Sequence, residues 1–257
     1  MRRMLALAAA AVLLGAGCGD DDGDDGGSGN GTRLVVSAAS SMSEALEACA
    51  PEFEDAEDAD VRLSFAGSDE LAAQIRQGAR VDVYAAANTS LPEELYGEDL
   101  LSEPVEFATN EFVLAVPADS EIESVGDVAQ PGIKVVVGSE SVPIGSYTRE
   151  SLAKLPPDQE QAILGNVVSN EPDVKGIVGK LSQGAGDAGF VYVTDVNATG
   201  SDLKAIDLPD DLEPDVTYGA GVPTEAREPD LGQEFLAGLT LGPCATALEE
   251  AGFGPSP

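Results

Sequence analysis

Two serines, Ser41 and Ser68, stand where this sequence could bind an anion. Each follows a short apolar run and precedes apolar residues at helical spacing, so each is predicted to lie at a turn from a strand into a helix. The first N–H groups of a helix have no partner inside it and carry the positive end of the helix dipole, so such turns favour anions. Two of them would stand side by side at the carboxyl edge of a parallel sheet, where open α/β sheets bind ligands. Helix capping is the alternative role for both hydroxyls.

The composition excludes several classes of function. The 257-residue chain has no histidine, which excludes Ser-His-Asp and Cys-His catalysis and histidine-ligated zinc. Its formal charge of −34 argues against nucleic acid as a partner, because phosphate backbones are bound by Lys and Arg. The same charge repels anions at long range. A bound anion would therefore have to be held by short-range dipoles within the site.

The first 18 residues have the pattern of a bacterial lipoprotein signal. Two arginines precede an apolar segment too short to span a bilayer, and small residues then lead to Cys18. Cys18 is the predicted lipidation site, although Gly15 stands where that pattern prefers a branched apolar residue. An ordinary signal peptide with an incidental cysteine is the alternative. Residues 19–32 contain only Gly, Asp, Ser, Asn and Thr, so they are predicted to form a disordered tether.

Strands alternate with helices along the rest of the chain, which predicts an α/β fold. The stretch 107–116 is interpreted as one strand that carries the chain into a second lobe, and 216–222 as the strand by which it returns. The predicted lobes are 33–115 plus 217–257, and 116–216. Each is expected to be a mixed or parallel sheet flanked by helices, with the ligand cleft between them.

Five segments resemble, in the same order, the motifs of the molybdate-binding protein of bacterial molybdate ABC transporters, which has a type II periplasmic binding fold. The segments are 38–45, 65–79, 142–147, 172–176 and 189–192. The resemblance runs from about Arg33 to Phe253. It places ligand-binding hydroxyls at Ser41, Ser68 and Tyr192, and ligand-binding backbone amides at Ile144 and Val174. Three positions depart from the motifs: Gly67 replaces a serine, Ile144 a smaller residue, and Asn88 a frequent aspartate.

This resemblance implies a lipid-anchored, extracytoplasmic, monomeric protein that captures molybdate, and tungstate as well, and delivers it to an ABC permease in the cytoplasmic membrane. It implies no catalysis, no cofactor, and no metal other than the molybdenum of the bound oxyanion. None of the five site residues is Lys or Arg, so neutral donors would hold the dianion. All of its oxygens would be satisfied only when donors of both lobes close around it. The closed form is then what a permease could recognise.

Several alternatives remain open from the residues alone. A binding protein for sulfate, thiosulfate or phosphate is the alternative on the same fold. An exported enzyme would need paired carboxylates in the cleft, and a structural or adhesive surface protein would show no ligand response. The acids near the motifs, such as Glu44 and Asp173, lie in predicted first helical turns, where they complement the dipole. Tyr192 could be a half-buried core residue, and Val174 merely the first residue of a helix.

Cys49 and Cys244 are the two cysteines other than Cys18. In an exported protein they suggest a disulfide, here between the first helix and the last pair of helices within one lobe. Two buried free thiols are the alternative, because sequence spacing does not determine the separation of two Cβ atoms.

Overall fold

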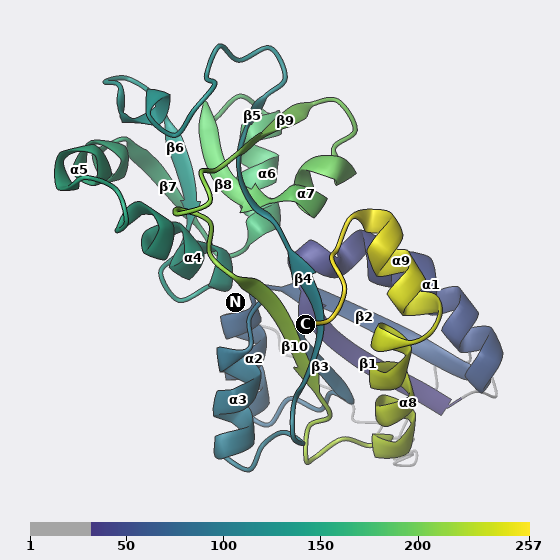
Figure 1. The fold of residues 1–257 in the computed structure, drawn as a ribbon. Coiled ribbons are helices and arrows are strands. Elements are labelled where there is room, and N and C mark those ends of the chain that lie inside the picture. The colour runs from purple at the N-terminus through teal and green to yellow at the C-terminus, as the bar shows by residue number, and fades with distance from the viewer. Residues whose placement is uncertain (1–31) are drawn as a thin grey trace, which may run out of the picture. The chain divides into compact units, whose positions relative to one another are not determined.

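The computed structural model describes residues 32–257, which contain two five-stranded mixed sheets (Figure 1). The strand order is β2-β1-β3-β10-β4 in the first sheet and β7-β6-β8-β5-β9 in the second. A lobe here means one sheet with the helices packed on it. The predicted signal peptide, Cys18 and the predicted tether as far as residue 31 lie outside the described residues.

The first sheet is built from both ends of the described chain. Its strands are β1 (Thr32–Ala39), β2 (Ala59–Ala66), β3 (Val83–Ala86), β4 (Val105–Asn110) and β10 (Val216–Gly221). Its helices are α1 (Ser43–Glu57), α2 (Ser68–Arg76), α3 (Ser90–Gly97), α8 (Pro229–Thr240) and α9 (Pro243–Ala251). Helices α1, α8 and α9 lie on one face of this sheet, and α2 and α3 on the other (Figure 1).

The second sheet is built from the middle of the chain. Its strands are β5 (Phe112–Pro117), β6 (Val135–Gly138), β7 (Val167–Glu171), β8 (Ala188–Tyr192) and β9 (Leu203–Asp207). Its helices are α4 (Pro143–Leu152), α5 (Pro157–Gly165), α6 (Val174–Ser182) and α7 (Val193–Ala198). These two lobes, each a mixed sheet flanked by helices, confirm the predicted α/β fold class.

Three parallel strands in each sheet place the candidate residues. In the first sheet β1 runs parallel to β2 and β3, while β10 runs antiparallel to β3 and β4. In the second, β6 runs parallel to β7 and β8, while β5 runs antiparallel to β8 and β9. The carboxyl ends of parallel strands meet at one edge of a sheet. The turns after β1 and β2 therefore lie together, and so do those after β6, β7 and β8.

The predicted boundary between the lobes at residues 115 and 116 is wrong. The stretch 107–116 holds parts of two strands, because β4 ends at Asn110 in the first sheet and β5 begins at Phe112 in the second. The crossing is thus at Glu111. Thr109, Asn110 and Glu111 interrupt the apolar run there, but a polar interruption does not show that the next strand pairs in another sheet. The chain returns to the first sheet at Val216, which pairs with Asn110, one residue before the predicted start of that segment.

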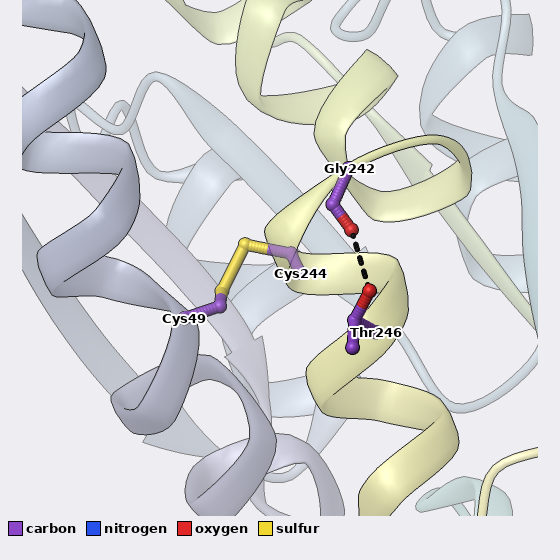
Figure 2. Close-up of a disulfide and its surroundings, with 4 residues drawn as sticks. All are labelled: Cys49, Gly242, Cys244 and Thr246. Atoms are coloured by element: carbon purple, nitrogen blue, oxygen red, sulfur yellow. Dashed lines mark hydrogen bonds between the residues drawn. A yellow bond between two sulfur atoms is a disulfide. The ribbon is translucent and has the colours of Figure 1, made fainter.

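A disulfide joins Cys49 on α1 to Cys244 on α9, with the sulfur atoms 2.02 Å and the Cα atoms 4.9 Å apart (Figure 2). Both side chains are buried. In the first turn of α9 the Thr246 hydroxyl donates to the carbonyl oxygen of Gly242 at 3.4 Å (Figure 2). The bond confirms the predicted pairing and ties the first helix of the described chain to the last.

Candidate functional site

All five residues predicted to bind the ligand line one cavity. Ser41 and Ser68 come from the first lobe, and Ile144, Val174 and Tyr192 from the second. The other lining residues are Ala39, Ser40, Ala66, Gly67, Ala87, Val142, Pro143 and Asp173. Asp173 is the only acid in this lining, and its Oδ1 accepts from the Gly176 amide at 2.9 Å as the cap of α6. The cavity wall is therefore neutral apart from one carboxylate that is already hydrogen-bonded.

Neither candidate serine caps a helix. Ser41 lies in a 3-10 turn, Ser40–Met42, and its Oγ is 2.9 Å from the hydroxyl of Tyr218. Ser68 is the first residue of α2, whose N-cap Gly67 makes no side-chain bond, and its Oγ accepts from the Ala87 amide at 3.1 Å. The capping alternative is thus wrong for both. Because the Ser68 oxygen already accepts a backbone N–H, its own hydrogen is free to be donated.

The two candidate amides belong to first helical turns of the second lobe. Helix α4 begins at Pro143, so Ile144 is in its first turn, where an N–H has no acceptor inside the helix. Val174 opens α6 directly after the capping residue Asp173, which satisfies the amide of Gly176 and not that of Val174. These positions make both amides available to an anion.

Tyr192 supplies the most informative polar atom of the cavity. It ends β8, is 1 % exposed, and its hydroxyl has no hydrogen-bond partner among the described residues. Burial raises the pKa of this phenol well above its ordinary value, so the group stays a protonated donor. A buried donor without an acceptor costs free energy, and buried polar groups in native proteins are nearly all paired. A role as a half-buried core residue therefore does not explain why the Tyr192 hydroxyl is buried without a partner. The hydroxyl instead indicates a place where a ligand could supply the acceptor.

A charged cluster that the sequence did not reveal joins the two lobes beside the cavity. Lys175 on α6 lies with its Nζ 2.8 Å from Oε2 of Glu44 on α1 and 3.2 Å from Oδ1 of Asp195 on α7. Burial acts to lower the pKa of Lys175, but the charge of Asp195 and the hydrogen bond to Glu44 raise it overall. The sequence predicts for Glu44 only a place in a first helical turn, where its charge complements the helix dipole. The one signal in the sequence is that Lys175 directly follows the candidate ligand residue Val174.

Asp195 should make the stability of the protein depend on pH. Its carboxyl is completely buried, and burial raises its pKa to about 6 against the opposing charge of Lys175. The unfolded value is about 3.9. Between these values the folded state binds more protons than the unfolded state, so this contribution to stability is present at low pH and is lost as pH rises through about 6. When the pH is lowered from 7.5 to 5, the free energy of unfolding of wild type should therefore rise by on the order of 1 kcal/mol relative to that of Asp195→Asn.

Urea unfolding at the two pH values measures this difference. The exposed carboxylate of Asp202 offers a matched control, since Asp202→Asn removes an equal charge without burial. The same pH response in both variants would show that Asp195 titrates as an ordinary surface acid.

The turn before α2 leaves no room for a side chain between the lobes. A Cβ atom built on Gly67 would lie 2.4 Å from the carbonyl oxygen of Pro172, which directly precedes the cap of α6. The lobes are also joined near the crossing point, where the Asn110 side chain donates to the Thr194 hydroxyl at 2.9 Å. The departure at Gly67 therefore coincides with a place at the cavity where the two lobes are too close for a side chain.

Two α/β lobes joined by crossing strands, with a cavity between the carboxyl ends of their strands that residues of both lobes line, define a two-lobed binding protein. No helix in residues 32–257 is long and apolar enough to cross a membrane. Nor does this part of the chain hold a group of three or more His, Cys, Asp or Glu side chains placed to bind a metal ion.

Comparison with known proteins agrees with this class. Residues 34–254 match the model of the family described as bacterial extracellular solute-binding protein. The chain is 33% identical over 224 residues to the molybdate-binding protein ModA of Mycobacterium tuberculosis, covering 86% of this chain and 84% of that one. It is 29% identical over 253 residues to YvgL of Bacillus subtilis, named as an ABC transporter substrate-binding lipoprotein, covering 95% and 94%.

Among solved structures, the sulfate-binding protein SubI of Mycobacterium tuberculosis superposes with a TM-score of 0.78 at 17% identity, covering 87% of each chain. At that identity the likeness concerns the fold alone. The chain belongs to the family of bacterial extracellular solute-binding proteins.

Proposed function

We propose that this protein captures molybdate, and tungstate as well, outside the cytoplasm and delivers it to an ABC permease, without catalysing a reaction and without a cofactor. The 33% identity to a molybdate-binding protein over 86% of the chain supports the ligand. So does the presence in one cavity of all five residues matched to that family's motifs.

The observation that carries the proposal is the unpartnered hydroxyl of Tyr192. It lines the cavity together with Ser68, whose oxygen already accepts a backbone N–H and whose hydrogen is therefore free. Amides of first helical turns complete a set made of donors. A fully deprotonated tetrahedral oxyanion offers acceptors only and matches such a set. The one carboxylate in the lining, that of Asp173, already accepts from the Gly176 amide.

Attachment to the membrane is a second part of the proposal. The pattern of the first 18 residues supports lipidation at Cys18, and a relative that covers nearly the whole chain is named as a lipoprotein. The protein would act as a monomer on the outer side of the cytoplasmic membrane. Each molecule would pass its ligand to the permease in the closed form.

Thermal unfolding with molybdate, tungstate, sulfate and phosphate in turn tests the ligand. A ligand at about a hundred times its Kd adds about 2.7 kcal/mol to the free energy of unfolding, which moves Tm by several degrees for a chain of this size. We expect molybdate and tungstate to produce this shift and the other two ions not to. Tyr192→Phe keeps the ring and removes one donor, so its shift at the same ligand concentration should be smaller.

Equal shifts with sulfate or phosphate would move the assignment to another oxyanion on the same fold. No shift with any of the four ions would show that the cavity is not an oxyanion site.

A further inference from the structure

Ser41 is connected to a buried hydrogen-bond network that reaches the crossing point between the lobes. The Tyr218 hydroxyl on β10 lies 2.9 Å from Ser41 Oγ, and Asn110 Nδ2 lies 3.3 Å from the same phenol oxygen. Asn110 Nδ2 also lies 2.9 Å from the Thr194 hydroxyl. Tyr218 has no exposed surface, and its ring packs edge-on against Phe253 with centroids 5.2 Å apart.

The direction of each hydrogen in this network can be derived. The Glu111 amide donates to Asn110 Oδ1 at 2.9 Å, and this assigns the oxygen and the nitrogen of the Asn110 side chain. The two hydrogens of Nδ2 then go to Thr194 and Tyr218, so the phenol oxygen of Tyr218 is an acceptor.

That leaves the single phenol hydrogen of Tyr218, for which Ser41 Oγ is the acceptor within reach. If Ser41 donated to Tyr218 instead, the buried phenol hydrogen would have no acceptor, which is costly. Burial also raises the pKa of Tyr218 well above its ordinary value, so the phenol keeps its hydrogen. The hydroxyl hydrogen of Ser41 is therefore released from the network, and Ser41 lines the cavity.

We infer that Tyr218 is a positioning residue for the ligand: by donating to Ser41 Oγ, it makes the Ser41 hydroxyl a donor into the cavity. The inference rests on the proposed function, because it assigns a direction to one of the donors proposed there. The two serines then have the same role. The Ala87 amide donates to Ser68 Oγ and the Tyr218 phenol donates to Ser41 Oγ, so each serine keeps its own hydrogen for the ligand.

The test is a double-mutant cycle measured by isothermal titration with molybdate. Tyr218→Phe keeps the ring and its packing, and we expect it to weaken binding by about 10-fold in the wild-type background. In the Ser41→Ala background the same change should weaken binding by less than about 2-fold, since the group through which it acts is gone. In the matched Ser68→Ala background, where the phenol still orients Ser41, the full loss of about 10-fold should return.

The dependence on background separates positioning from a structural role. Equal losses in the two serine backgrounds, or no loss in the wild-type background, would overturn the inference while leaving the proposed function intact. If the wild-type protein binds none of the four oxyanions, the proposed function has failed and the role of Tyr218 fails with it. Circular dichroism and Tm of the ligand-free variants control for folding. If Tyr218→Phe does not fold, Ser41→Ala should weaken molybdate binding about as much as Ser68→Ala, since both hydroxyls are donors into the cavity, and a Ser41→Ala variant that binds as tightly as wild type would overturn the inference.

Discussion

Replacing both Cys49 and Cys244 by alanine is expected to lower the free energy of unfolding by roughly 3 to 5 kcal/mol. The bond joins residues 195 positions apart, so removing it frees a long loop in the unfolded chain. For a protein of this size the loss corresponds to a fall in Tm of about 10 °C. Alanine is preferred to serine because both positions are buried, and a serine hydroxyl there would need a partner.

Differential scanning calorimetry of wild type and the double variant, each with and without a reducing agent, measures this effect. Reduced wild type should unfold close to the variant, and the variant should not respond to the reductant. The affinity for molybdate should be unchanged, because neither cysteine lines the cavity. A wild-type Tm that is the same with and without the reductant would contradict the prediction.

Replacing Gly67 by alanine should weaken oxyanion binding by about 10- to 100-fold without destabilising the ligand-free protein. The new Cβ would lie 2.4 Å from the carbonyl oxygen of Pro172 on the facing lobe, and a backbone atom cannot move aside as a side chain can. Overpacking of this kind costs about 1 to 3 kcal/mol, and each 1.4 kcal/mol is tenfold in affinity. The backbone at Gly67 is extended, with φ −62° and ψ 137°, which alanine adopts without strain. Within the first lobe the new Cβ would lie 2.9 Å from Asp69 Oδ1, the end of a side chain that can turn aside.

Titration with molybdate measures the loss of affinity, and the Tm of the ligand-free protein shows whether its stability is unchanged. Gly97→Ala is the matched control, because a Cβ at Gly97 meets no atom within 4 Å. We expect it to leave the affinity unchanged. A Gly67→Ala variant that binds as tightly as wild type would show that binding does not need the lobes to approach as closely as they do here.

Much of the site could be predicted because its residues occupy local, recurring positions. A β-branched run followed by small residues and a helical pattern predicts a strand-to-helix turn, and this placed Ser41 and Ser68 correctly. The order of the five motifs then identified Ile144, Val174 and Tyr192, and all five residues line one cavity. Whether they bind the oxyanion remains a prediction.

The disulfide was predictable for a different reason. Two cysteines besides the predicted lipidation site offer only one pairing, and a disulfide is expected between them in an exported protein. The expected lobe boundary was wrong, because β4 and β5 follow one another almost directly and pairing with distant strands decides which sheet each one joins. The polar residues Thr109, Asn110 and Glu111 mark the break, but they do not show that the chain changes sheets there.

By itself, then, the sequence determined the α/β class, the turns that carry the candidate donors, and the family to which the chain belongs. Only the tertiary structure decided which side chains meet across long separations. Tyr218 lies 177 residues from Ser41, and Lys175 lies 131 from Glu44. Turn chemistry and helical periodicity depend on neighbours a few residues away, so they can be read from the chain. The partner of a buried hydroxyl or carboxylate depends on how distant elements pack, and that is settled only when the whole chain has folded.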